Sequence, residues 1–451
     1  MIGLNEIFEP SSLTEWIEQL KKDLKGEAFS KLERNDQIED IDYTTFAHQE
    51  SRPIPDQAPG NFPFTRGLRT SDNNWNNGYY LRVTDESTSN KKALEILMKG
   101  AELLIIDVSS SYHTDWNTLL NRIELEFIQA QFVLTTIEQY HSLRNFLKGS
   151  IPATISINID PIGKNYDKSL IDILLKDLGA GQFAAFFVDG ASIQQSGATT
   201  WHELGFCLST GHEYLCALME SGLTIDEAAA CIHFSIGIGS NYFYEVAKIR
   251  ALKKLWSSVV EQYQPVHNCS YNCRITAHTG FLNKSLADPY TNLLRQTTEV
   301  MSAATGGVEG IVIHPYDSCS EKGTSVLSER MALNISLILK EESYFNAVID
   351  PLGGSYAIEN LTELIAERSW SFFQALDIKG GINSEEARTY LKSSILEKAT
   401  LRIEQIRSGR KVLIGVNKFT NPKPETNVFT ELPTYLGLPK LILEQTLISA
   451  Q

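Results

Sequence analysis

From residue 101 onward, short runs rich in Val, Ile and Phe alternate with longer amphipathic stretches. The short runs are Leu103–Val108, Gln131–Thr135, Thr154–Ile159, Phe183–Val188, Ala230–Ile238, Arg274–Thr279, Ile311–His314 and Ala347–Asp350. Helical spacing marks Thr200–Gly222, Asn241–Tyr263, Tyr290–Ala304 and Leu327–Lys340, with a weaker candidate at Tyr166–Leu178. Apolar runs of this length indicate strands buried on both faces of a parallel sheet. About eight such strands alternating with helices over roughly 250 residues predict an α/β fold, a (β/α)8 barrel of the TIM type.

A doubly wound open sheet is the alternative fold for this rhythm. A phosphate-binding loop would favour it, and the chain has none. GIG at 237–239 lacks a third glycine, because Tyr242 stands there, and GK at 163–164 is followed by Asn165.

Two charged or irregular segments flank the predicted barrel. Residues 1–50 form an N-terminal arm with a helix from Ser12 to Leu24, in which Ser12 is the N-cap and Glu15 completes a capping box. This arm either covers the main domain or reaches a partner. The barrel is assigned to 51–378, and its first part, 51–78, is rich in Pro, Asn and Gly and is interpreted as loop. Residues 379–451 form a C-terminal extension, with a helix at Ser384–Ile406, a strand-like run at 411–416 and an irregular tail.

The composition excludes several classes of function. The 451 residues carry a formal net charge of −15, which argues against nucleic-acid and anionic-membrane binding because both need a basic surface. Six cysteines are spread along the chain with no paired zinc-ligand spacing, so we expect no metal site. The segment Met1–Pro10 contains Glu6 and Glu9 and does not look like a targeting sequence, and no apolar stretch has membrane-spanning length. A cytoplasmic location is expected.

The stretch from Phe186 to Glu203 marks where chemistry is expected. A buried strand is followed by a polar loop and then by a helix that starts near Thr200, where Thr200 and Glu203 fit a capping box. The loop therefore lies at the carboxyl end of a strand, which is where parallel β/α proteins keep their active sites.

The histidines suggest little chemistry by themselves. His202 is interpreted as a surface residue in the first turn of a helix and His212 as part of a polar helix face. His233 and His314 lie within predicted strands and are interpreted as core residues with satisfied hydrogen bonds. His278 lies near the end of a strand, so it is a candidate to line a cavity at the barrel mouth.

A series of motifs resembles the adenosylcobalamin-dependent methylmalonyl-CoA mutase family from about Pro63 to Asn421. In family order they are PFTRG (63–67), QQSGAT (194–199), GHEYL (211–215), ESGLTID (220–226), NYFYEVAKIRA (241–251), DPYTN (288–292), DPLGGSY (350–356) and GVNKF (415–419). The resemblance implies a barrel that, in catalytic members, threads a coenzyme A ester along its axis. It also implies a separate carboxyl-terminal domain that supplies cobalamin.

The first departure from the family concerns its catalytic pair. Catalytic members have Tyr and His shortly before the position of Gln194, and this chain has Ala191 and Ser192 instead. In the family the His donates a hydrogen bond to the migrating thioester carbonyl, and the Tyr helps to wall the reaction cavity. Alanine offers no hydroxyl, and serine is shorter than imidazole and does not titrate near neutrality. The resemblance therefore implies no catalytic residue in this chain.

The second departure concerns the cofactor. The family's cobalamin domain uses Asp-x-His-x-x-Gly, whose His is the lower cobalt ligand. None of the nine histidines here has Asp two residues before it, and the chain stops soon after Gly415–Phe419. Because cobalamin carries the radical chemistry, we expect this chain to bind no cofactor and adenosylcobalamin to sit on a partner subunit.

The segment after the first motif also diverges. Catalytic members have an aromatic and Arg-rich segment there that grips coenzyme A, whereas this chain has LRTSDNNWNN at 68–77. Arg66 and Arg274 remain as possible anion contacts. Together with Gln194 and His278 they form a vestigial substrate-binding set.

These observations predict the non-catalytic small subunit of a heterodimeric methylmalonyl-CoA mutase. Its large-subunit partner would bind adenosylcobalamin and interconvert (R)-methylmalonyl-CoA and succinyl-CoA. One alternative is the substrate-binding half of a split mutase that acts on another acyl-CoA. A further alternative is a stand-alone acyl-CoA-binding module.

Overall fold

A computed structural model describes residues 11–25, 28–44, 46–48, 50, 58–111, 113–148, 154–161, 173–174, 186–422 and 428–448. The segment Met1–Pro10, which carries the targeting prediction, lies outside the described residues, as does most of the predicted helix Tyr166–Leu178. None of the helices within these described ranges is long and apolar enough to cross a membrane.

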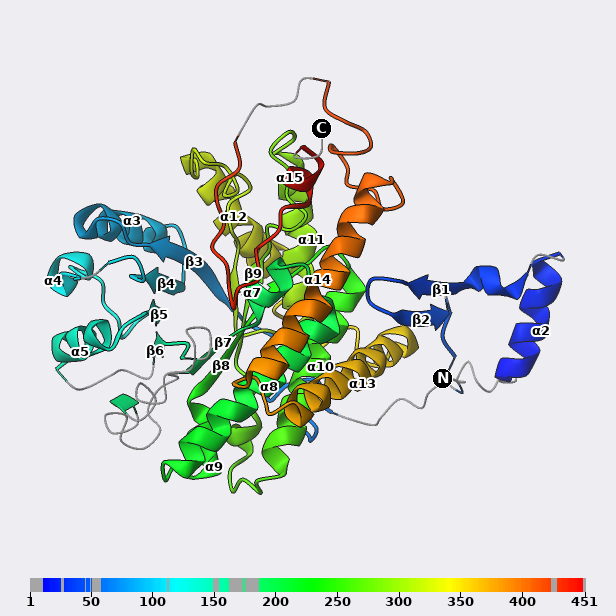
Figure 1. The fold of residues 1–451 in the computed structure, drawn as a ribbon, viewed down its shortest axis with the longest axis horizontal. Helices are drawn as coiled ribbons and strands as arrows, with labels where there is room; N and C mark the ends of the chain where they lie inside the picture. The colour runs from blue at the N-terminus through cyan, green and yellow to red at the C-terminus, as the bar shows by residue number, and fades with distance from the viewer. Residues whose placement is uncertain are drawn as a thin grey trace.

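Eight parallel strands form the barrel at the centre of the molecule (Figure 1). In chain order they are β3 (Asn76–Arg82), β4 (Leu103–Asp107), β5 (Gln129–Val133), β6 (Ile155–Asn158), β7 (Phe186–Asp189), β8 (Ile232–Ile238), β9 (Ile275–Thr279) and β10 (Gly310–Val312). The hydrogen-bonded order is β6-β5-β4-β3-β10-β9-β8-β7. A parallel bridge between Ile159 and Phe186 brings the two edge strands together. The predicted (β/α)8 barrel is confirmed.

One barrel strand was predicted wrongly. The loop interpretation of 51–78 is wrong at its end, because β3 begins at Asn76. The polar start of this strand is accommodated by neighbouring backbone, since the Asn77 side-chain amide donates to the carbonyl of Gly100 at 3.1 Å. Gly78 lets β3 approach β10, because a Cβ there would lie 2.7 Å from the side chain of Val312.

The run Ala347–Asp350 is not a strand among the described elements but a series of bends. Its side chains do not face a sheet, since Val348 is 55% exposed. Asp350 has a positive φ of 46° and its carboxylate lies between Arg66 and Arg250. The barrel therefore reaches eight strands through β3 and not through this run.

Helices cover the outside of the barrel (Figure 1). They are α3 (Glu86–Met98), α4 (Trp116–Leu119), α5 (Ile137–Phe146), α7 (Gly190–Gln195), α8 (Thr200–Glu220), α9 (Ile225–Ala230), α10 (Tyr242–Glu261), α11 (Thr291–Gly306), α12 (Val326–Leu337) and α13 (Tyr356–Ile378). The C-terminal extension adds α14 (Glu385–Arg407) and α15 (Leu443–Ile448). The long amphipathic stretches are thus helical as predicted, and a π-helical turn, Ile338–Glu342, continues α12.

The start of α8 differs from the prediction. Its N-cap is Thr199, whose side chain accepts from the backbone of His202, so the capping box of Thr200 and Glu203 is wrong. Glu203 instead points inward, where it is fully buried and its carboxylate lies 2.7 Å from the ammonium of Lys248 on α10. Glu245 is the second partner of this ammonium, at 2.5 Å. A buried ion cluster therefore joins α8 to α10.

The N-terminal arm consists of α2 (Leu13–Asp23), a short 3₁₀ turn and the antiparallel hairpin β1 (Glu33–Asp36) and β2 (Ile41–Thr44). The predicted capping box of Ser12 and Glu15 is confirmed. Figure 1 shows α2 at the outer end of the hairpin, away from the barrel.

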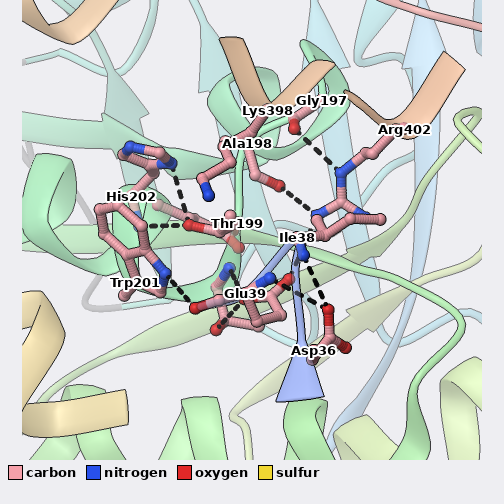
Figure 2. Close-up of polar contacts among 12 residues, drawn as sticks. Asp36, Ile38, Glu39, Gly197, Ala198, Thr199, Trp201, His202, Lys398 and Arg402 are labelled. Carbon is pink, nitrogen blue, oxygen red and sulfur yellow. Dashed lines mark hydrogen bonds and ion pairs between the residues drawn. The ribbon is translucent and has the colours of Figure 1, made fainter. Parts of the chain in front are cut away.

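The hairpin tip, residues 36–40, is clasped between α8 and α14 (Figure 2). The carboxylate of Glu39 is buried there and accepts from the backbone N–H of Thr200 at 2.9 Å and from Arg402 at 3.1 Å. An anion at the N-terminus of a helix is favoured by the helix dipole. Lys398 donates to Asp40 at 2.6 Å, so two adjacent residues of the tip are fixed to the body.

The chain after α14 returns to the barrel. The run 411–416 contains no named strand and forms only a bridge between Ile414 and Lys418, so the strand interpretation is wrong. Residues 428–444, here called the strap, cross the carboxyl end of the barrel in Figure 1 as the red segment that leads into α15.

Candidate functional site at the barrel mouth

A cavity of about 830 Å³ lies at the carboxyl end of the barrel. We call it the mouth cavity. Residues at or just after the ends of five strands line it, namely Arg82, Val133, Asn158, Asp189 and Ile313. A cavity in this position is where parallel barrels bind their ligands.

Ala191 and Ser192 both line the mouth cavity, at the start of α7. The expected polar loop is this short helix, capped by Asp189 at the end of β7. The Ser192 hydroxyl donates to the Asp189 carboxylate at 2.5 Å, and the Ser192 backbone donates to the same group at 3.0 Å. Because a serine hydroxyl has one proton, this side chain has no donor left for a ligand carbonyl.

Tyrosine–carboxylate pairs close two further sides of the cavity. Tyr80 donates to Asp107 at 2.6 Å, and burial with this carboxylate raises the pKa of Tyr80 well above its usual value. Asp160, directly after the bridge that closes the barrel, accepts from Tyr214 at 2.7 Å and from Tyr435 at 2.5 Å. The hydroxyl protons of these tyrosines are therefore bound to carboxylates.

The strap crosses the mouth and is fixed at several points. Besides the bond from Tyr435 to Asp160, the backbone of Leu441 donates to Gln195 at 2.8 Å and that of Leu443 to Leu282 at 3.0 Å. Further along, the buried carboxylate of Glu444 accepts from the backbone of Leu286 at 2.6 Å. Strap residues line the mouth cavity too, and these are Thr430, Glu431, Leu432, Pro433 and Lys440.

His278 lines the mouth cavity and is 6% exposed. Burial lowers the pKa of His278 to about 4, so its ring is neutral at pH 7. Its Nε2 has no hydrogen-bond partner among the described residues, and the same holds for Oε1 of the neighbouring Gln195. The ring stacks near His314, with centroids 5.8 Å apart. His314 lies just after β10 and lines the cavity, so its interpretation as a strand core residue is wrong.

Three further histidines form hydrogen bonds within the fold. His202 is 1% exposed, which overturns its surface interpretation, and its Nδ1 lies 2.9 Å from the hydroxyl of Thr199. His233 is a satisfied core residue as predicted, with Nε2 2.8 Å from Thr276. His212 is half-buried and its Nε2 lies 2.8 Å from the hydroxyl of Tyr263.

The four residues of the predicted substrate-binding set do not meet in one place. Arg66 pairs with Asp350 at 3.1 Å and lines a cavity of about 290 Å³ near the amino ends of β3 and β10. Arg274 comes directly before β9, at the opposite end of that strand from His278. Gln194 faces a third cavity beside the barrel. Only His278 lines the mouth, and a binding role for any of the four stays a prediction.

The sequence interpretation missed Tyr80, Asp107, Asp160 and Tyr435. Asp107 lies in a predicted strand and Asp160 directly follows one, so strand-end position was an available signal for both. No comparable signal marked Tyr435, which lies 275 residues from Asp160 in the sequence.

The strap bears on the corrinoid that the family resemblance implies, because it crosses the mouth of the barrel. A cofactor would have to reach the cavity through the opening that the strap crosses. Nε2 of His278 has no hydrogen-bond partner among the described residues, and this ring lines the cavity together with residues of the strap. We therefore derive no step through cobalamin on this chain.

The fold and cavity define a parallel β/α-barrel protein with a ligand-sized cavity at its carboxyl mouth. A family model described as methylmalonyl-CoA mutase matches residues 177–434. The methylmalonyl-CoA mutase small subunit of Porphyromonas gingivalis is 31% identical over 450 residues, covering 92% of this chain and 70% of the relative. The chain therefore belongs to the methylmalonyl-CoA mutase family.

Other relatives agree with this assignment. The probable small subunit of Mycobacterium tuberculosis is 29% identical, over 84% of this chain and 64% of that protein. The methylmalonyl-CoA mutase of Cereibacter sphaeroides is 27% identical, over 92% of this chain and 65% of its own length. The chain thus spans about two thirds of the length of these relatives. Among solved structures, dihydropteroate synthase from Thermus thermophilus aligns with 59% of this chain and 96% of its own, at 12% identity and a TM-score of 0.31.

Proposed function

We propose that this chain is the non-catalytic small subunit of a heterodimeric methylmalonyl-CoA mutase. The observation that carries the proposal is the hydrogen bonding of the Ser192 hydroxyl. It stands where catalytic members have their histidine, and its hydroxyl proton is bound to Asp189. The strap across the mouth supports the same conclusion, because it occupies the approach that a cofactor domain would need.

In this proposal the chemistry belongs to the partner. A large subunit would hold adenosylcobalamin, which supplies the radical that drives the interconversion of (R)-methylmalonyl-CoA and succinyl-CoA. This chain would contribute a rigid barrel and its arm, and so stabilise the large subunit through an obligate interface.

Helix α2 supports a partner for the arm. Leu13, Trp16, Ile17 and Leu20 give it an apolar stripe, yet none of its residues is buried. An amphipathic helix gains most of its stability from packing its apolar face. The helix lies at the outer end of the hairpin, away from the barrel (Figure 1), and within the described chain Trp16 packs on Phe46, with ring centroids 4.1 Å apart.

Affinity purification tests the proposal. We expect the tagged chain, isolated from its native cell, to bring down one copy of a larger mutase-family protein that contains corrinoid. A variant with Trp16→Ala and Leu20→Ala should retain less of that protein, whereas Glu33→Gln on the exposed face of β1 should retain as much as the unmodified chain. Isolation of the chain without any such protein would contradict the proposal.

The split-mutase alternative is favoured by one observation. The mouth cavity contains two buried polar atoms without partners in the described part of the chain, Nε2 of His278 and Oε1 of Gln195. Such atoms are costly unless a ligand or water satisfies them. Calorimetry with succinyl-CoA separates the two functions, because tight binding supports the alternative and absence of heat supports the non-catalytic subunit.

A further inference from the structure

The third cavity, which Gln194 faces, has a volume of about 510 Å³ and lies outside the barrel mouth. We call it the side cavity. Its walls come from the hairpin tip, from α10 and α11, and from the segment after α14. This volume falls in the range of sites that bury a small organic ligand. Neither the proposed reaction nor the proposed partner uses it.

The inner end of the side cavity carries an unused amide. Gln194 is 7% exposed, and its Oε1 has no hydrogen-bond partner among the described residues. Glycines surround this amide. A Cβ at Gly237 would lie 2.7 Å from Oε1, and one at Gly239 would lie 3.2 Å from Nε2. Because Oε1 is enclosed by this packing, the NH₂ group is the part of the amide that can hydrogen-bond with an occupant of the cavity, as a donor.

The rim of the cavity carries an unpaired cation. Arg402 pairs with Glu39, and Lys248 pairs with Glu203 and Glu245. Lys411 lines the same cavity, and its ammonium forms no ion pair or hydrogen bond with the described part of the chain. Burial lowers the pKa of Lys411, and Asp36 and Glu39 offset this effect only in part.

The side cavity also has an apolar wall. Leu282, Ile406, Leu413 and Leu443 form a small core cluster, and all four line the side cavity. The hairpin tip supplies a further wall through Ile38 and Glu39, which the clasp in Figure 2 holds in place. An occupant therefore meets an apolar wall as well as the ammonium of Lys411 and the amide of Gln194.

We propose that the side cavity binds a small amphipathic carboxylate with a second polar group. The carboxylate pairs with Lys411, the carbon chain packs on the leucine cluster, and the second group hydrogen-bonds with the amide of Gln194. Binding at this place is independent of the mouth cavity and of the partner subunit.

Isothermal titration of the full chain with 4-acetamidobutanoate tests the proposal, with N-butylacetamide as the probe that lacks the carboxylate. We expect saturable binding of the first probe and binding at least about tenfold weaker for the second, because a charge-assisted hydrogen bond is lost. Lys411→Met should weaken 4-acetamidobutanoate about tenfold or more, and Gln194→Leu should weaken it about fivefold or more, as expected for one lost neutral hydrogen bond.

Arg82→Gln, which alters the mouth cavity only, should leave the affinity for 4-acetamidobutanoate unchanged. Thermal melting of each variant shows that it is folded, and Lys411 is only half-buried, so its replacement should fold normally. Absence of binding, equal affinity for the two probes, or affinity that both Lys411→Met and Gln194→Leu leave unchanged would overturn the proposal. A loss of affinity caused by Arg82→Gln would place the probe in the mouth and would overturn it too.

Discussion

At the residue scale, hydroxyl groups at the mouth donate their protons to carboxylates of the same chain. Ser192 donates to Asp189, and Tyr80 donates to Asp107. The surrounding motif was enough to identify Ala191 and Ser192 as the positions of the catalytic pair. Hydrogen-bond partners at the mouth could not be predicted in this way, because a hydrogen bond between residues far apart in the sequence depends on how the strands are arranged. Tyr435 and Asp160 are the clearest case.

Buried neutral histidines predict a pH dependence of stability. Burial lowers the pKa of His202 and His233 to about 3 and that of His278 to about 4. In the unfolded chain these rings titrate near pH 6.5, so below that value the unfolded state binds more protons. The unfolding free energy therefore has its full value, as far as these three histidines are concerned, above about pH 6.5. It decreases as the pH falls toward their pKa values in the folded protein.

Urea unfolding at pH 6.5 and pH 5 measures this loss. With His233→Phe, the drop in unfolding free energy between the two pH values should be smaller by about 2 kcal/mol, since each histidine contributes about 1.4 kcal/mol per pH unit. His267→Asn, at an exposed position, is the control and should keep the full drop. If the unfolding free energy of the His233→Phe variant fell between the two pH values as much as that of the unmodified chain, His233 would not be a buried neutral histidine of this kind.

At the element scale, periodicity predicted most helices and seven of the eight barrel strands to within a few residues, and missed β3. It failed where tertiary contacts override the pattern. Asn77 and Gly78 make the sequence of β3 unlike that of a buried strand. The fold tolerates them because the carbonyl of Gly100 accepts from the Asn77 amide, and because β10 packs so close to Gly78 that a side chain would not fit there. The spacing of Thr200 and Glu203 fits a capping box. In the structure, however, Glu203 is buried and pairs with the ammonium of Lys248.

The ion cluster between α8 and α10 predicts a large mutational effect. Lys248→Met should lower the unfolding free energy by about 3–5 kcal/mol, because it leaves Glu203 and Glu245 buried without a cation. Lys379→Met is the matched control, since the partner of Lys379, Glu386, has a side chain that is 71% exposed. This control should cost at most about 1 kcal/mol. If denaturant unfolding gave equal losses of free energy for Lys248→Met and Lys379→Met, the buried position of the ion cluster would not add to its stabilising effect.

The hairpin tip gives a local prediction. Glu39→Gln removes the charge that pairs with Arg402 and turns an NH₂ group toward a guanidinium, so the clasp should loosen. We expect amide hydrogen exchange in residues 33–44 to speed up by about tenfold or more, in keeping with the loss of a hydrogen bond to a charged group. Glu33→Gln should leave the exchange rates unchanged. Unaltered exchange with Glu39→Gln would show that the carboxylate does not hold the tip.

At the scale of the whole molecule, a barrel with a crossed mouth carries an arm whose outer helix buries none of its residues against the described chain. The alternation of strands and helices was enough to predict the barrel, because that rhythm has few solutions. The strap was not predictable, because an irregular segment shows no period and is positioned only by bonds such as that of Leu441 to Gln195.

Mutase turnover by the purified chain tests the central claim most directly. The assay contains (R)-methylmalonyl-CoA and adenosylcobalamin, with and without the cobalamin-bearing large subunit. A non-catalytic subunit predicts no succinyl-CoA from the chain alone and full turnover once the large subunit is present. Succinyl-CoA formed by the chain alone would contradict the account.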